Sequence, residues 1–256
     1  MGTAVGPAKT STGGVLFAPV IGVADVLVFL SRPQDLVDPT CRAAARAALG
    51  PDDAAHVARF RFEADRDQAL ASRALQRRAL SACAPVAPAA WRFVAGAHGR
   101  PEIADPVVAP RLRFNVANTR GLVACAVTAE RDVGLDVEPW RDDAPPELVA
   151  RCFSADERAA LAALPAAARP RRFVELWTLK EAYLKARGLG LDAPLERISL
   201  VLDDGPPRLA LDPALGDDAA AWQLALWAPT PTHAAALCVR RGAGPPLTIE
   251  RRWDPR

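Results

Sequence analysis

Apolar and polar residues follow two different periods in the middle of this chain. Residues 173–187 contain no glycine or proline, consist largely of good helix formers, and precede Gly188, a residue type favoured directly after helices. Residues 132–140 instead alternate apolar and acidic side chains, which is the period of a half-buried strand, and Pro139 ends the alternation. We therefore predict a helix over the first stretch and a strand over the second.

Polar side chains gather on one face of each of these elements. Asp136 and Glu138 point to the same side of the predicted strand, roughly 7 Å apart along the chain. Trp177, Glu181 and Lys185 recur every fourth residue and so share one face of the predicted helix. Acids on a strand are most often its solvated face, and a Glu–Lys pair one turn apart often only stabilises a surface helix, by about 0.2–0.5 kcal/mol. Paired carboxylates are also the oxygen ligands that Mg²⁺ accepts, so both interpretations stay open at this point.

Similar signals predict helices and strands along the rest of the chain. Asp38 before Pro39 marks the start of a helix that runs to Leu49, and Ser154 with Glu157 forms a capping box for another. A further helix is predicted over residues 67–80. Strands are predicted over residues 23–30, 91–94, 122–128, 198–202, 222–227 and 234–239.

Composition excludes several classes of protein. Half of the 256 residues are hydrophobic and 24% are charged, which is typical of a globular protein. The net charge of only +2 argues against a dedicated nucleic-acid binder. The apolar run 15–30 is short and interrupted by Pro19, Gly22 and Asp25, so we expect no membrane attachment. The five cysteines are scattered without a Cys-x-x-Cys pair, which favours reduced thiols in the cytoplasm over zinc ligands.

Taken together, the strand and the helix resemble a known family. The pattern Gly-x-Asp-x-Glu, followed about forty residues later by Trp-x-x-Lys-Glu-x-x-x-Lys, is similar to the signature of 4′-phosphopantetheinyl transferases, with the long-chain, Sfp-like group the closer match. Shorter family patterns recur at Gly99-Arg100-Pro101 and around Phe153 and Ser154. The resemblance covers about residues 58–200.

The resemblance implies the architecture. We expect an α+β fold of two similar subdomains related by a pseudo-twofold axis, with the ligand cleft between them. A buried strand rich in small residues in each half, 122–128 and 233–239, is consistent with such a duplication. We assign residues 1–14 to a disordered N-terminal extension, 15–140 to the N-terminal subdomain, 141–242 to the C-terminal subdomain and 243–256 to a tail.

The resemblance also implies the reaction. A monomeric enzyme would transfer 4′-phosphopantetheine from coenzyme A to a serine of an apo acyl- or peptidyl-carrier protein and release adenosine 3′,5′-bisphosphate. Asp136, Glu138 and Glu181 would hold Mg²⁺, for which Mn²⁺ could substitute, with Asp136, Glu181 and Lys185 as the catalytic residues. Either Glu181 or a metal-bound water would accept the serine proton. The carrier protein and its pathway stay open.

The resemblance also implies which residues bind coenzyme A, and the sequence departs from the family pattern at one of these places. Relatives carry Phe-Asn-x-Ser-His, whereas Ala117 and Asn118 occupy the last two places here and offer neither a hydroxyl group nor a positive charge. This departure favours an alternative hypothesis, a catalytically weakened member that binds a carrier protein or a nucleotide. The residues assigned to coenzyme A are Arg77, Arg100, Asn118, Lys180 and Lys185.

Overall fold

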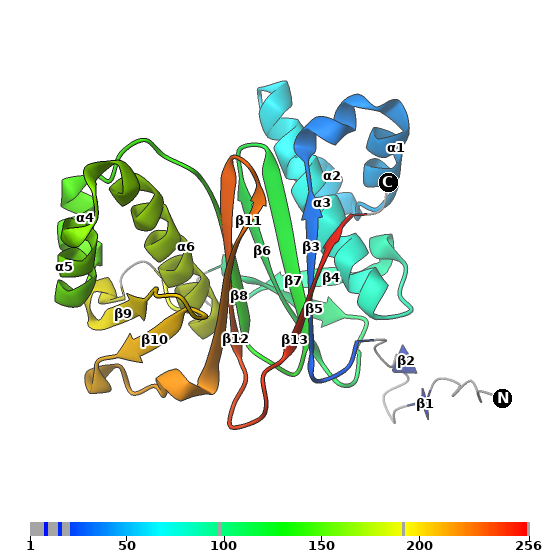
Figure 1. Cartoon of the computed structure of the whole chain (residues 1–256). Coiled ribbons are helices and arrows are strands. Elements are labelled where there is room, and N and C mark those ends of the chain that lie inside the picture. Colours follow the sequence, from blue (N-terminus) through cyan, green and yellow to red (C-terminus); the bar gives the residue numbers. More distant parts are fainter. Residues whose placement is uncertain (1–7, 10–14, 17–20, 97–98, 191–192, 255–256) are drawn as a thin grey trace. The chain divides into compact units, whose positions relative to one another are not determined.

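The protein has an α+β fold, as predicted, which forms two compact units (Figure 1). The computed structural model describes residues 8–9, 15–16, 21–96, 99–190 and 193–254. The first unit comprises Met1–Phe114, Cys125–Arg131 and Thr248–Arg256, and the second comprises Asn115–Ala124 and Asp132–Leu247. This division differs from the predicted boundary at residue 140, because strands β6 (Leu112–Thr119) and β7 (Leu122–Ala129) each pass from one unit into the other.

Two of the three helices of the first unit begin at residues that favour helix starts. The Asp38 carboxylate accepts hydrogen bonds from the backbone N–H groups of Thr40 and Cys41, which caps the first of them as predicted. Gly50, the residue after the predicted end of this helix at Leu49, is the N-cap of the next helix. The helices are α1 (Pro39–Ala47), α2 (Pro51–Ala58) and α3 (Glu63–Cys83).

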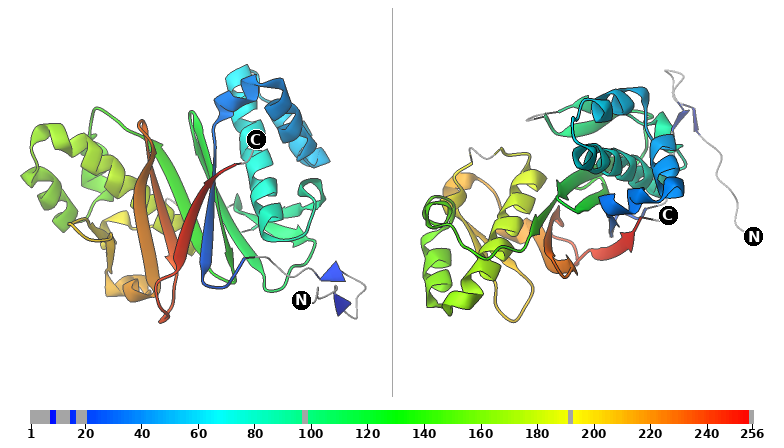
Figure 2. Two further views of the ribbon diagram at one scale, coloured as in Figure 1. Left: turned by 45° about the vertical axis from the view of Figure 1, so that its right-hand side comes forward. Right: turned by 90° about the horizontal axis from the view of Figure 1, so that it is seen from above.

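A four-stranded sheet supports α3, which packs against strand β3 (Asp25–Ser31) in the views of Figure 1 and Figure 2. Its strand order is β13-β3-β7-β6, with β13 (Thr248–Trp253) parallel to β3. Strands β4 (Arg92–Ala95) and β5 (Pro101–Asp105) form a separate antiparallel pair, as do β1 (Ala8–Lys9) and β2 (Val15–Leu16). The predicted disorder of residues 1–7 and 10–14 lies outside the described residues.

The predicted C-terminal tail contains an ordered edge strand instead. The Arg32 guanidinium lies 4.3 Å from the centre of the Trp253 ring, and the backbone N–H of Asp254 donates to the carbonyl oxygen of Leu30 at 2.7 Å. The Asp254 carboxylate pairs with Arg78 of α3 at 3.0 Å. A charged edge strand lacks the apolar alternation of a buried one, so the sequence pattern did not reveal it.

We expect the stability of the first unit to depend on pH through Asp254. Burial raises the pKa of this carboxyl to about 6, although Arg78 acts to lower it. The protonated form is therefore favoured in the folded state, and its stabilising contribution is lost as the pH rises from 4 through 6. Asp254→Asn should gain about 1–2 kcal/mol relative to the parent between pH 4.5 and pH 7.5. Thermal melts at both pH values measure this, with the exposed Asp204→Asn as control. An equal difference at both pH values would contradict the prediction.

The second unit is built around one long helix that covers a three-stranded sheet. The helix is α6 (Arg169–Arg187), and it ends at Gly188, whose left-handed backbone (φ +69°) suits glycine. It packs against β8 (Val133–Pro139) and β12 (His233–Arg240), and the strand order is β11-β12-β8, with β11 spanning Trp222–Thr230. The remaining elements are α4 (Pro146–Cys152), α5 (Ala155–Ala163), and the antiparallel pair β9 (Ile198–Val201) and β10 (Arg208–Leu211).

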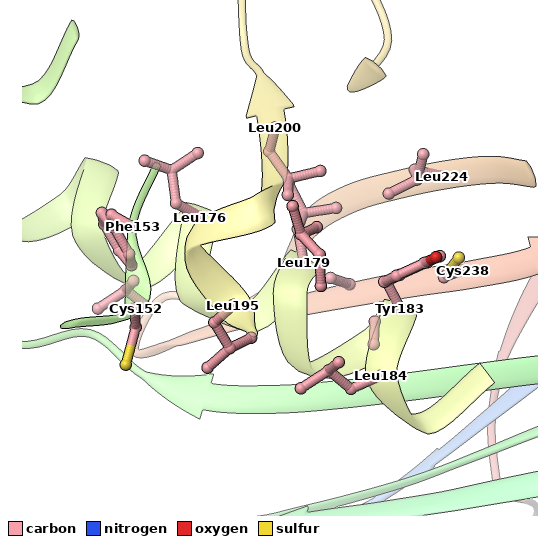
Figure 3. Close-up of a cluster of buried hydrophobic side chains, with 14 of the residues drawn as sticks. Cys152, Phe153, Leu176, Leu179, Tyr183, Leu184, Leu195, Leu200, Leu224 and Cys238 are labelled. Atoms are coloured by element: carbon pink, nitrogen blue, oxygen red, sulfur yellow. The ribbon is translucent and has the colours of Figure 1, made fainter. Parts of the chain in front are cut away.

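Buried apolar side chains fix α6 in place. Leu176, Leu179 and Leu184 of this helix point into a cluster with Phe153 and Leu200, which Figure 3 shows around the helix. The cluster is almost completely shielded from solvent, since Leu179 and Phe153 are 0% exposed. Within the part of the chain that the structure describes, no helix has the length and apolar composition of a membrane span.

Candidate active site

Strand β8 presents two carboxylates as its alternation predicts. Val133, Leu135 and Val137 are buried, while Asp136 and Glu138 lie on the other face of the strand. The residues paired with these two acids on β12 are Ala236 and Ala234. Because alanine is small, the neighbouring strand leaves room beside both carboxylates.

Gly134 lets α6 lie directly on this strand. A Cβ atom at Gly134 would come within 2.0 Å of the carbonyl oxygen of Ala182 and 2.3 Å of the backbone nitrogen of Ala186. No other residue type fits so close to a helix backbone. This contact brings Glu181 and Lys185 of the helix next to Asp136.

Two hydrogen bonds join the strand to the helix at the site. The Lys185 ammonium lies 2.5 Å from Asp136 Oδ1, and Trp177 Nε1 donates to Glu138 Oε1 at 3.3 Å. Two buried carboxylate oxygens, Asp136 Oδ2 and Glu181 Oε1, have no hydrogen-bond partner among the described residues. A buried acceptor without a partner is costly, so these oxygens suit a cationic or proton-donating ligand.

Burial destabilises the ionised form of all three acids, and repulsion from Asp136 adds to this effect at Glu138 and Glu181. Burial raises the pKa of Asp136 against the opposing effect of Lys185. Burial and then the Asp136 charge raise the pKa of Glu138, and the same two causes raise the pKa of Glu181 to about 6. Three carboxylates with one ammonium leave excess negative charge in a partly buried place, which favours a bound cation.

The carboxylate oxygens at this site are of the type that binds Mg²⁺, but the side chains are not arranged around a common ion position. Mg²⁺ takes one or two protein carboxylates and completes its shell with water and phosphate oxygens, and two carboxylate oxygens without partners are available here. Within the described ranges, however, no three side chains of the His, Cys, Asp or Glu type are placed to hold a metal ion together. Lys185 occupies one oxygen of Asp136, and Glu138 holds the Trp177 indole. Asp136 and Glu181 are therefore the residues that fit the ion best.

Lys180 does not join these residues, although the sequence analysis assigned it to coenzyme A. Its side chain is fully buried, and the ammonium lies 2.8 Å from Glu157 Oε2. It also donates to the carbonyl oxygens of Leu195 and Ile198. Lys180 is next to Glu181 in the sequence, but consecutive residues of a helix point in different directions. The Lys180 side chain therefore points into the core of the second unit, away from Glu181.

Arg77, which the family resemblance assigned to coenzyme A, is buried in the first unit. It is 4% exposed, its Nε donates to Asp53 Oδ2 at 2.5 Å, and its Nη1 donates to the carbonyl oxygens of Pro88 and Trp91. It lines a cavity of about 320 Å³. Other basic residues of that lining, which the sequence analysis did not assign to a ligand, are His56, Arg59, Arg73 and Arg92. His56 and Arg59 lie at the end of α2, Arg73 in α3 and Arg92 in β4, so no local sequence pattern marked them as one set.

The remaining assigned residues lie in strands and loops. Arg100 Nη2 donates to the carbonyl oxygen of Phe114 at 2.8 Å within the first unit. Asn118 is exposed on β6, and Ala117 beside it is buried. No sequence pattern indicated a role for Asn115, whose Oδ1 accepts a hydrogen bond from the backbone N–H of Leu135 at 2.8 Å. This contact holds β8 at the residue before Asp136.

Comparison with known proteins gives consistent matches for both parts of the chain. The family model of the 4′-phosphopantetheinyl transferase superfamily matches residues 132–238, and that of the 4′-phosphopantetheinyl transferase N-terminal region matches residues 39–130. The 4′-phosphopantetheinyl transferase HetI of Nostoc sp. is 34% identical over 75% of this chain and 79% of its own length.

Two further matches are weaker. The 4′-phosphopantetheinyl transferase Sfp of Bacillus subtilis is 28% identical over 64% of this chain and 71% of its own length. A solved holo-(acyl-carrier-protein) synthase from Bacillus anthracis, in complex with CoA (3′,5′-ADP), is 20% identical with a TM-score of 0.37, and the match covers 44% of this chain and 96% of that one.

Proposed function

The chain belongs to the 4′-phosphopantetheinyl transferase superfamily, and from this premise we propose that it transfers phosphopantetheine from coenzyme A to a serine of an apo acyl- or peptidyl-carrier protein. The other product would be adenosine 3′,5′-bisphosphate. The observation that carries the proposal is the pair of buried, unpartnered oxygens of Asp136 and Glu181 beside Lys185.

Asp136 and Glu181 would hold Mg²⁺, and Glu138 on the same face of β8 would be a third ligand once the pyrophosphate of coenzyme A is bound. The bound ion would neutralise charge on the pyrophosphate as the bond to phosphorus breaks. Lys185 would leave Asp136 for a phosphate oxygen of the leaving group, because a phosphate offers a charge-assisted hydrogen bond of comparable strength. Glu181 is our candidate for accepting the proton of the attacking serine.

The basic cavity of the first unit is our candidate for the phosphates of the coenzyme A nucleotide. Arg59, Arg73 and Arg92 line it, and the guanidinium geometry matches phosphate oxygens. Because Arg77 already donates to Asp53 and two carbonyl groups, we propose that it shapes this cavity more than it contacts the ligand. Arg100 and Asn118 remain proposed contacts.

The proposal predicts a specific mass change. Incubation with coenzyme A, Mg²⁺ and a panel of apo-carrier proteins should add one phosphopantetheinyl group to at least one carrier, as read by intact mass spectrometry. Chelator should stop the reaction, and Mg²⁺ or Mn²⁺ should restore it.

The alternative of a weakened member gives a different result. In that case isothermal titration would detect coenzyme A binding, while no carrier in the panel gains mass. Serine-to-alanine carriers serve as the control, since they cannot accept the group. A mass gain on such a carrier would contradict the proposed acceptor.

A further inference from the structure

A buried ion pair fastens α6 to the elements beside it at the residue before Glu181. Lys180 and Glu157 are each 1% exposed in their side chains, and their charged atoms lie 2.8 Å apart. Glu157 belongs to α5 and Lys180 to α6. The pair therefore joins two helices through a contact from which water is excluded.

Hydrogen bonds to backbone groups extend this pair into a network. The Glu157 carboxylate accepts from the backbone N–H groups of Ser154 at 2.7 Å and Leu200 at 2.9 Å. The Lys180 ammonium donates to Glu157 and to the carbonyl oxygens of Leu195 and Ile198, so its three protons are all used. The backbone of the 3-10 turn Leu195–Arg197 and of β9 is thus tied to both helices.

The two sides of α6 are then fixed by different means. On one side Gly134 brings the helix backbone onto β8, where its spacing is set by contact with Ala182 and Ala186. That packing limits how close the helix comes, but apolar contact alone permits small rotations about the helix axis. The buried ammonium of Lys180 has fixed acceptors, so it resists rotation and sliding at this point.

We propose that the Lys180–Glu157 pair is a positioning device that sets the rotation of α6 and thereby aims the Glu181 carboxylate at Asp136. The proposal rests on the function proposed above. A rotation of roughly 10° about the axis would move a carboxylate at the end of a glutamate side chain by about 1 Å, given the radius of an α-helix with side chains. A misplacement of that size costs on the order of 100-fold in rate.

The double variant Lys180→Met, Glu157→Gln tests the proposal, because it removes both charges while keeping similar volumes. Replacing both members of a buried pair is often neutral for stability, whereas removing one leaves an unpaired buried charge. Its Tm should fall, because Lys180→Met leaves the carbonyl oxygens of Leu195 and Ile198 without this donor, so melts define the temperatures at which the variant is assayed. Its kcat should fall on the order of 100-fold with the KM for carrier protein unchanged, since the surface is intact.

Binding of Mg²⁺ gives a readout that does not depend on turnover. Titration of Mg²⁺ in the presence of coenzyme A should show affinity about tenfold weaker in the double variant, the size typical of losing a group that orients a ligand. Ser154→Ala is the matched control, because it removes the Ser154 hydroxyl that caps α5 but keeps Lys180 and Glu157. This control should lower Tm and leave kcat and Mg²⁺ affinity near parental values.

The outcomes separate the positioning role from a merely structural one. Parental kcat and Mg²⁺ affinity in the double variant would overturn the proposal. If the double variant melts below the assay temperature, parent and variant are both assayed at a lower temperature at which the variant is folded, and a parental kcat there counts against the proposal. If the parent modifies no carrier, the proposed reaction fails, and the Mg²⁺ titrations still test whether the pair orients Glu181.

Discussion

Asp136→Asn and Glu181→Gln should each lower turnover by about 10³-fold or more while the protein stays folded. Each change keeps the side-chain shape but removes a negative charge, and the electrostatic contribution of a metal to phosphoryl transfer amounts to several kcal/mol. Folding should survive because burial raises the pKa of both carboxyls, which means that the ionised forms destabilise the folded state near neutral pH. Glu181→Gln should therefore melt at or above the parental Tm at pH 8.

Steady-state kinetics with a reactive carrier and thermal melts at the same pH measure both effects. Asp156→Asn is the control, since this acid is exposed on α5 of the same unit. Turnover near the parental value in either site variant would show that the carboxylate is not part of the reaction centre.

Gly134→Ala should lower both stability and activity. The added methyl group would need the space of the Ala182 carbonyl oxygen, 2.0 Å away, and a backbone atom in a helix cannot move alone. Overpacking of this kind costs about 1–3 kcal/mol or more, which in a chain of this size lowers Tm by at least about 2–4 °C per kcal/mol. Displacing α6 by about 1 Å would cost on the order of 100-fold in kcat.

Gly205→Ala is the matched control, because its Cβ would meet only Asp203 Oδ1 at an ordinary distance of 3.4 Å. We expect its stability within about 0.5 kcal/mol of the parent. If Gly134→Ala melts and turns over like Gly205→Ala, the close contact of α6 with β8 does not control the site.

Local signals predicted the two central elements well. The alternation over residues 132–140 and the helix formers over residues 173–187 depend on neighbours in the chain, and the structure confirms both. The helix begins four residues earlier than predicted, at Arg169, because Pro170 lies in the first turn, where its missing N–H group is not needed.

Contacts between residues far apart in the sequence were not predicted. Lys180 and Arg77 were assigned to the ligand because both are basic and lie in motifs, but their acceptors on Glu157 and Asp53 come from other helices. The spacing of residues in a helix predicts the face on which a side chain lies. The residue that contacts this side chain depends on tertiary packing, which the spacing does not reveal. The pairing of β8 with β12 is equally non-local, so the sequence predicted the strands without their order.

The parallel pairing of β13 with β3 has a consequence for biosynthesis. Residues 248–253 leave the ribosome after the whole of the second unit, so a nascent chain carries β3 with one open hydrogen-bonding edge for most of its translation. An apolar strand with an open edge is a template for wrong pairing, and Val26, Val28 and Phe29 make β3 strongly apolar. The sheet of the first unit therefore cannot close before the whole of the second unit has been synthesised, and β3 is open to wrong pairing until then.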